Sequence, residues 1–224
     1  MTVVFTTILG GSDSLKPAPV GADRCVCLVD DLWKYTDPKG WELVEITVAK
    51  GADPRRLAWR LRCLPDTVFD TYTRVIWIDA SFTLTNLPGL LKDAGDAPVA
   101  ALRHHNRHSP YDEAMQLVAI GQAREQDIAP QVHAYRQDGF NPFHLSISCV
   151  IVRDRSRIAR AFNETWAREI DTHLGDNTQV SLDYSAWKAG TEIRALKGTR
   201  HDNPYSVHDH LDHKRRRRPY WVPA

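Results

Sequence analysis

The stretch Arg74-Val-Ile-Trp-Ile-Asp79-Ala-Ser81 decides how this chain is expected to fold. Its residues 75–78 form a short apolar run rich in β-forming side chains, which predicts a strand covered on both faces. Asp79 falls where this strand ends, and ligands of open α/β sheets bind outside the carboxyl ends of the strands. A carboxylate at that place can hold a divalent cation, which in turn can hold a diphosphate. The alternative is that Asp79 only caps a turn or a helix.

Further strands and helices alternate on both sides of this central strand. Apolar or β-branched runs predict strands over residues 2–9, 24–29, 40–48, 98–102 and 147–152. Caps and apolar spacing predict helices that begin at Asp53 (with Pro54 first), at Asn86, at Asp112 (with a break near residues 127–130), at Ser156 and at Asp176. The helix from Ser156 is expected to bury one face, made by Ile158, Phe162, Trp166 and Ile170. This alternation predicts an α/β sheet within one domain.

Composition sets the broad class of protein. The chain has 224 residues, enough for one sizeable core, and its 42% hydrophobic and 25% charged residues are ordinary for a globular protein. A formal net charge of +1 provides no overall attraction to nucleic acid or membranes. The chain lacks CxxC pairs, so Cys25, Cys27, Cys63 and Cys149 are expected to be free thiols. We expect a cytoplasmic protein, because we see neither a signal peptide nor an apolar run of the roughly 18–20 residues that a membrane span needs.

Polar residues gather where the predicted strands end. Gly10 and Gly11 follow the first strand, and such a loop either lets backbone N–H groups meet a phosphate or base, or is simply a turn. Asp30 and Asp31 follow the second strand. The cluster of residues 103–108 follows a later strand and can bind a sugar or an anion, or form an exposed loop. The helix from Asp53 carries four arginines, which form a solvated face or include one that reaches a phosphate site: Arg55, Arg56, Arg60 and Arg62.

The order of these motifs resembles a known family. The stretches that carry the resemblance are Thr6 to Leu15, Asp53 to Arg56 with Arg62 and Phe69, Trp77 to Ser81, Arg103-His104, Tyr111 to Ala114, Tyr135 with Gly139-Phe140, Cys149 to Arg153, Trp166, and Asp176 to Ser181. Over about residues 3–190 they are similar to the glycosyltransferase-like proteins known as domain-of-unknown-function family 616. The resemblance implies a Rossmann-like, glycosyltransferase A-type mixed sheet flanked by helices, in a single domain over residues 1–198. A His-rich and basic C-terminal tail over residues 199–224 is expected to follow.

The resemblance also implies a reaction and a site. The expected enzyme moves a sugar from a nucleotide-sugar, with a UDP-sugar as the expected donor, to a hydroxyl acceptor with the help of Mn²⁺ or Mg²⁺. Asp79 and a histidine near the C-terminus, His208 or alternatively His201, are the expected metal ligands, with His208 preferred. The expected donor and acceptor contacts are Thr7, Gly11, Asp30, Arg62, Asp79, Ala80, Ser81, Arg103, His104, Tyr111, Glu113 and Gln179. If the reaction inverts, a carboxylate must take the acceptor proton, and Glu113 and Asp176 are the candidates; if it retains, no such base is required.

This chain departs from the family pattern at three places. Arg62 stands where the family commonly has lysine, which keeps a cation. Gly175 precedes Asp176 in place of an arginine. The stretch Asp79-Ala-Ser81 is not a full Asp-x-Asp, so only one carboxylate of the usual metal pair is present.

The acceptor and the activity leave alternatives open. The basic run Lys214 to Arg218 precedes Tyr220 and Trp221, and pairs phosphate-binding charge with stacking rings. It suggests a nucleic-acid acceptor, for example a hydroxymethylated base in DNA, although a solvated tail or a polysaccharide acceptor are alternatives. The incomplete Asp-x-Asp motivates another class, a non-catalytic module that binds nucleotide-sugar or nucleic acid. A Rossmann-type oxidoreductase is disfavoured because no GxGxxG follows the first strand.

Overall fold

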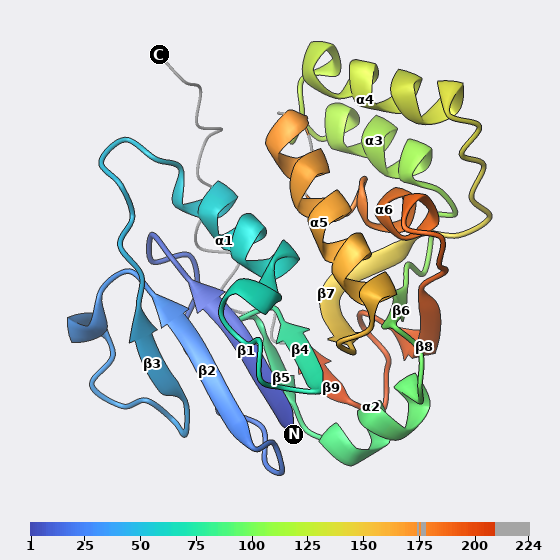
Figure 1. Cartoon of the computed structure of the whole chain (residues 1–224). Coiled ribbons are helices and arrows are strands. Elements are labelled where there is room, and N and C mark those ends of the chain that lie inside the picture. Colours follow the sequence, from blue (N-terminus) through green and yellow to red (C-terminus); the bar gives the residue numbers. More distant parts are fainter. Residues whose placement is uncertain (174, 176–177, 209–224) are drawn as a thin grey trace.

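Seven strands form one mixed sheet at the centre of the structure, a computed structural model that describes residues 1–173, 175 and 178–208 (Figure 1). The strands follow the order β3-β2-β1-β4-β7-β6-β8 across the sheet. Their bounds are β1 Thr2–Ile8, β2 Arg24–Val29, β3 Glu42–Glu45, β4 Arg74–Ile78, β6 Val99–Arg103, β7 Ser146–Arg153 and β8 Arg194–Thr199. A second sheet pairs β5 (Phe82–Leu84) with β9 (Ser206–His208). The expected mixed α/β sheet in a single domain is confirmed.

The strand directions bring several strand ends to one edge. β3, β2, β1 and β4 run parallel to one another, and β7 runs antiparallel to both β4 and β6. The carboxyl ends of β1, β2, β4 and β6 therefore meet at one edge, and β7 begins there. Residues that follow parallel strands share the crevice in which open α/β sheets bind ligands.

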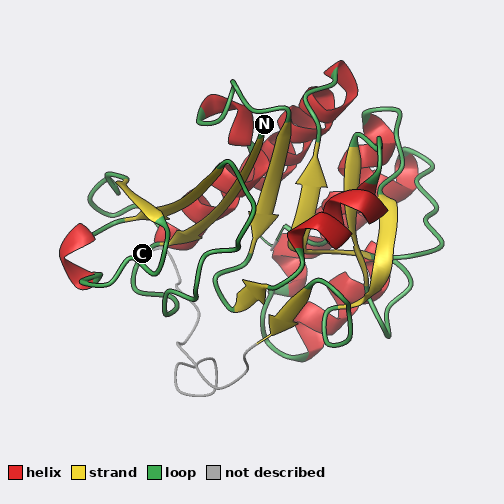
Figure 2. Cartoon of the chain, turned by 90° about the horizontal axis from the view of Figure 1, so that it is seen from below, coloured by secondary structure: helices red, strands yellow, loops and turns green. Residues whose placement is uncertain are grey.

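Helices cover the two faces of the main sheet differently. The helices are α1 Pro54–Cys63, α2 Leu87–Ala94, α3 Pro110–Ala119, α4 Glu125–Gln137, α5 Arg157–Thr172 and α6 Leu182–Lys188, with short 3-10 turns η1 Leu32–Lys34 and η2 Pro65–Thr67. α1, α5 and α6 pack on one face, where Phe5, Trp77 and Trp166 are buried (Figure 1). α2 and the short strands β5 and β9 pack on the other face, around Ile78 and Tyr205 (Figure 2).

The helix boundaries agree with most of the sequence signals. The side chains of Asp53, Asn86 and Ser156 cap α1, α2 and α5 as predicted. The expected core face of α5 is also present, because Phe162, Trp166 and Ile170 are almost fully buried, whereas Ile158 is 41% exposed.

The predicted break in the helix over residues 112–136 was placed wrongly. α3 ends at Ala119 and α4 begins at Glu125, with Gly121 in the left-handed region at φ +69° between them. Pro130 lies inside α4 instead of breaking it. Pro130 and Gln126 are both exposed, so water can reach the Gln126 carbonyl that Pro130 leaves without an intrahelical donor.

The C-terminal part of the described chain differs from the expectation in two ways. The expected division at residue 198 falls inside β8, and residues 199–208 continue into β9, which pairs with β5. The last helix begins at Leu182, not at the segment from Asp176 to Gln179. Asp176 and the basic run Lys214 to Arg218 lie outside the described residues.

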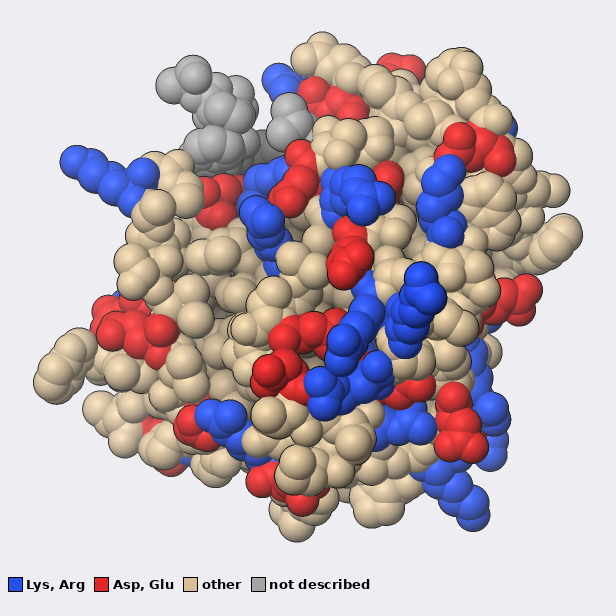
Figure 3. Space-filling view, in the orientation of Figure 1, with Lys and Arg blue, Asp and Glu red and all other residues tan. Residues whose placement is uncertain are grey.

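Three further observations concern the chain as a whole. All four cysteines are free thiols, as predicted. Among the described residues, no helix has the length and apolar character needed to cross a membrane. Positive and negative side chains are interleaved over the face that Figure 3 shows, in the orientation of Figure 1, so this face does not form an uninterrupted positive stripe of the kind that follows nucleic acid.

Candidate functional site

Asp79 occupies a fixed position at the carboxyl end of β4. Its backbone N–H donates to the carbonyl of Cys149 at 2.8 Å, which continues the pairing of β4 with β7 by one residue. Its carbonyl accepts from the N–H of Phe82 at 2.9 Å, which closes the turn that leads into β5. The Asp79 side chain is 28% exposed. The sheet edge therefore holds one partly accessible carboxylate at the place that the sequence predicts.

Arg62 holds this carboxylate from the helix α1. Its Nη2 donates to Oδ1 of Asp79 at 2.8 Å, and its guanidinium lies over the Trp77 ring, 4.5 Å from the centroid. The indole Nε1 of Trp77 donates to the same Oδ1 at 2.9 Å. Nη1 of Arg62 donates to Ser148 and Thr178 at 2.9 and 3.0 Å. Arg62 is thus buried and neutralises Asp79, in contrast to the exposed arginines of the same helix.

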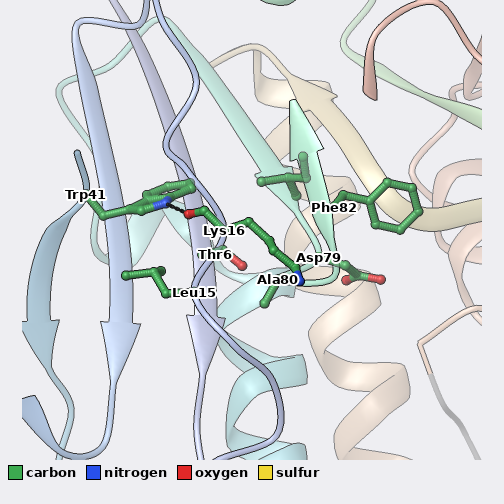
Figure 4. Close-up of a pocket in the computed structure, with 8 residues that line it drawn as sticks. Thr6, Leu15, Lys16, Trp41, Asp79, Ala80 and Phe82 are labelled. Carbon is green, nitrogen blue, oxygen red and sulfur yellow. Dashed lines mark hydrogen bonds between the residues drawn. The ribbon is translucent and has the colours of Figure 1, made fainter. Parts of the chain in front are cut away.

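A small pocket lies beside Asp79, on the face of β4 opposite to Arg62 and Trp77 (Figure 4). It is lined by Thr6, Leu15, Lys16, Trp41, Ile78, Asp79, Ala80 and Phe82. The Trp41 indole donates to the Lys16 carbonyl at 2.8 Å, and the Lys16 side chain reaches toward Ala80. The pocket has a volume of only about 10 Å³, the room of about one water molecule, so it does not enclose a nucleotide. Its residues, a ring, an ammonium group and a carboxylate, mark the part of the sheet edge where a phosphate-bearing ligand can bind from outside.

Sequence reasoning chose some of these residues and missed others. Asp79 and Ala80 were predicted, whereas Lys16 and Trp41 were not used, although a lysine directly after the glycine loop is a visible signal. Thr6 lines the pocket instead of the predicted Thr7, because successive residues of a strand face opposite sides of the sheet.

Gly11 and Asp30 shape the loop beside this pocket. Gly10 and Gly11 adopt φ values of +64° and +62°, which non-glycine residues rarely do. The N–H of Gly10 donates to Oδ2 of Asp30 at 2.6 Å, while Oδ1 of Asp30 is buried without a hydrogen bond. Ser81 is buried in the turn after Asp79. These predicted residues surround the pocket and give the loop its conformation, but they are not among the residues that line it.

The predicted acceptor residues form a separate cluster at the end of β6. Arg103 donates to the Ser146 hydroxyl at 2.7 Å and to the Ile193 carbonyl at 2.9 Å. Glu113 is 3% exposed and forms an ion pair with Arg107. A buried carboxylate held by a guanidinium is poorly placed to take a proton from an acceptor. These contacts assign Arg103 and Glu113 to the shape of the loop that follows β6. Gln179, from the predicted acceptor side, is partly buried just before α6.

His104 also shapes this loop through its backbone contacts. Nδ1 of His104 accepts from the N–H groups of Asn106 and Arg107 at 3.1 and 2.9 Å. Burial, with the nearby charge of Arg107, lowers the pKa of His104 from 6.5 to about 4. His104 is therefore a neutral hydrogen-bond acceptor at neutral pH.

Four imidazole rings connect this loop to the second sheet. The centroids of His104 and His105 lie 4.8 Å apart, those of His105 and His201 5.1 Å, and those of His201 and His208 5.8 Å. His208 stacks on Phe82 with centroids 4.4 Å apart. The predicted metal ligand His208 thus packs against the residue that closes the Asp79 turn.

A metal ion held by Asp79 and His208 does not fit these side chains. Oδ1 of Asp79 is bound by Arg62 and Trp77. Nε2 of His208 lies 3.1 Å from Nη2 of Arg200, and its Nδ1 is buried. Within the part of the chain that the structure describes, no three His, Cys, Asp or Glu side chains are grouped so as to hold a metal ion. The need for Mn²⁺ or Mg²⁺ stays a prediction.

The central strand β4 and the carboxylate at its end lie within a glycosyltransferase-like domain. Residues 38–197 match the family described as TOD1/MUCI70, glycosyltransferase-like domain, and the chain belongs to this family. The predicted glycosyltransferase-like family is confirmed at this level. No curated protein matches the chain. The chain is similar to a solved structure of WbbM, a bifunctional glycosyltransferase in its apo form, with 11% identity and a TM-score of 0.47; the match covers 87% of this chain and 38% of that one.

Proposed function

We propose that this chain is a glycosyltransferase of the A type. It moves a sugar from a nucleotide-sugar donor, with a UDP-sugar as the preferred candidate, to a hydroxyl acceptor. The observation that carries the proposal is the position of Asp79, at the carboxyl end of a central strand and at the border of a pocket with an aromatic wall and a lysine. Family membership supports the reaction class. The donor would lie at the carboxyl edge of the sheet, outside the small pocket, with its diphosphate near Lys16 and Asp79.

The reaction requires stabilisation of the leaving group. A nucleoside diphosphate departs with developing negative charge, and fixed cations aimed at it lower the barrier. The Lys16 ammonium is one such group at the pocket. Arg62 and Trp77 both donate to Oδ1 of Asp79, so Oδ2 can accept a hydrogen bond from a hydroxyl of the sugar donor. Because Glu113 is paired with Arg107, the base of an inverting reaction would come from Asp176 or another group, and a retaining reaction needs none.

The first experiment measures release of the nucleotide from a panel of UDP- and GDP-sugars, with and without Mn²⁺. We expect turnover with one donor, and we expect Asp79→Asn to reduce it at least about 100-fold, since it removes a charge at the reacting centre. Asp70→Asn is the matched control, because Asp70 is exposed in the loop before β4. Equal turnover in Asp79→Asn and wild type would contradict the proposal.

A non-catalytic binding module is the second candidate, and the Arg62–Asp79 ion pair favours it, because a neutralised carboxylate is a weaker catalytic group. This candidate predicts nucleotide binding without turnover of any donor. The acceptor remains open between a polysaccharide and a nucleic acid. A DNA acceptor predicts an affinity for DNA that falls steeply with salt, and a salt-independent affinity would count against it.

A further inference from the structure

Arg200 follows β8, and its guanidinium contacts the aromatic rings of Phe82 and His208 in place of a carboxylate. Its Cζ lies 5.8 Å from the centroid of Phe82, and its Nη2 lies 3.1 Å from Nε2 of His208. Its Nε is buried without a hydrogen-bond partner. Among the described residues, Arg200 forms no ion pair with a carboxylate. The guanidinium is thus a fixed positive charge whose hydrogen-bonding capacity is only partly used.

Arg200 and Asp79 both contact Phe82, although the two residues are far apart in the sequence. Phe82, over which Arg200 lies, donates its N–H to the Asp79 carbonyl at 2.9 Å and lines the pocket with Asp79. Cys149 on β7 provides a second measure of proximity. Burial and the charge of Asp79 raise the pKa of the Cys149 thiol, Arg200 and Arg62 lower it, and the resulting pKa is about 12. All three charged groups therefore act on one thiol on β7, beside the end of β4.

The two arginines near Asp79 have different roles. Arg62 donates hydrogen bonds to Asp79, Ser148 and Thr178, and the Asp79 carboxylate neutralises its charge within the protein. The Arg200 guanidinium has no such carboxylate partner among the described residues, so its charge can act on a ligand. A dication between Asp79 and His208 would face the positive charge of Arg200, and like charges at close range repel. The same position suits an anion, because a planar guanidinium matches the oxygen atoms of a phosphate.

We infer that Arg200, and not a divalent cation held by Asp79 and His208, supplies the positive charge that binds the second phosphate of the donor's diphosphate. This inference rests on the proposed nucleotide-sugar donor. Arg200 donates N–H groups to the phosphate oxygens, while Phe82 and His208 keep the guanidinium in place.

The test compares a nucleoside diphosphate with its monophosphate, because only the second phosphate should depend on Arg200. We would measure the affinities of UDP, UMP, GDP and GMP by calorimetry, in EDTA and in Mn²⁺. We expect the diphosphate to bind about 10- to 100-fold more tightly than the monophosphate in EDTA, as charge-assisted hydrogen bonds imply.

Arg200→Gln should bring the two affinities within about threefold and leave the monophosphate affinity unchanged. Arg200→Lys should restore part of the preference. Arg194→Gln, which changes an exposed arginine on β8, is the matched control.

Two different failures can be told apart. If the wild type prefers the diphosphate only in Mn²⁺, or if Arg200→Gln keeps the preference in EDTA, the inference about Arg200 is wrong while the proposed donor class stands. If no nucleotide binds the wild type with or without Mn²⁺, the proposed function itself fails. Thermal melting of each variant shows that it is folded. Should Arg200→Gln not fold, the metal dependence of the wild type and the behaviour of Arg200→Lys still decide the question.

Discussion

Nη2 of Arg62 lies 2.8 Å from Oδ1 of Asp79, and this ion pair joins the helix α1 to the end of the central strand β4. The two residues are 17 positions apart in the sequence. The pair is part of a buried network, since the same guanidinium also binds Ser148 on β7 and Thr178 before α6. One side chain thus positions the candidate functional carboxylate and connects three parts of the fold.

Removing Arg62 should therefore destabilise the protein. Arg62→Met leaves the partly buried charge of Asp79 without its counter-charge and removes one donor from each of the Ser148 and Thr178 hydroxyls. Breaking a fully buried ion pair destabilises a protein by about 3–5 kcal/mol. Because Asp79 is 28% exposed, we expect a smaller loss here, of about 2–3 kcal/mol in the free energy of unfolding. Denaturation in urea measures this loss.

Arg60 provides the matched control for this prediction. It lies on the same helix and pairs with Asp171 at 3.6 Å, but both side chains are about half exposed. Exposed pairs contribute little, so Arg60→Met should cost about 0–1 kcal/mol. Equal effects of the two substitutions would mean that the Arg62 network contributes no more than a surface ion pair.

Trp166 supports the same network from α5. Its Nε1 donates to the carbonyl of Thr178 at 2.9 Å, and Thr178 has a positive φ of 76°, which is unusual for a β-branched residue. Trp166→Phe retains most of the packing and removes this hydrogen bond. We expect a loss of about 1–3 kcal/mol in unfolding free energy, because a buried hydrogen bond to the Thr178 carbonyl is removed. Trp187→Phe, at a ring that is 43% exposed, should change stability by less than about 0.5 kcal/mol.

The stability of the fold should depend on pH through His104. Its pKa in the folded protein is lowered from 6.5 to about 4, so between these values the unfolded chain takes up a proton that the folded chain does not. The contribution of His104 is therefore complete above about pH 6.5 and is lost as the pH falls toward about 4. His104→Asn keeps an acceptor for the N–H groups of Asn106 and Arg107 but does not titrate.

Urea denaturation at about pH 7 and about pH 4.5 tests this expectation. The variant His104→Asn should lose less unfolding free energy than the wild type between the two conditions. His133→Asn, at an exposed position of α4, should behave like the wild type. A wild-type pH dependence in His104→Asn would show that protonation of His104 does not limit stability in acid.

The central part of the fold was predictable because its local signals agree with its packing. The apolar run before Asp79 is buried on both faces, and Asp53 and Ser156 cap their helices, since these features depend on neighbours close in the sequence. β9 was not predicted, because it has only three residues and Val207 among them is 59% exposed. So short a segment shows no recognisable alternation of apolar and polar residues. Its pairing with β5 depends on a contact between residues more than 120 positions apart.

The candidate site was only partly predictable for a similar reason. Asp79 could be found because it follows a strand, and Arg62 because it belongs to a recognisable helix. Arg200 and Trp41 carry no local signal for a site, and only the folded chain brings them to the surroundings of Asp79. Glu113 has a suitable residue type, but its burial and its pairing with Arg107 depend on the tertiary structure.

Tyr205 tests whether residues 199–208 belong to the cooperative fold. Its ring is 3% exposed, its hydroxyl donates to Asp93, and its carbonyl accepts from the N–H of Thr85 at 2.7 Å. Tyr205→Phe should cost about 1–2 kcal/mol through the lost hydrogen bond to a carboxylate. Tyr205→Ala should cost about 3–5 kcal/mol, as large-to-small changes in a core do. Val207→Ala, at an exposed position of β9, should have almost no effect. A Tyr205→Ala variant that unfolds at the urea concentration of the wild type would mean that residues 199–208 do not belong to the cooperative fold.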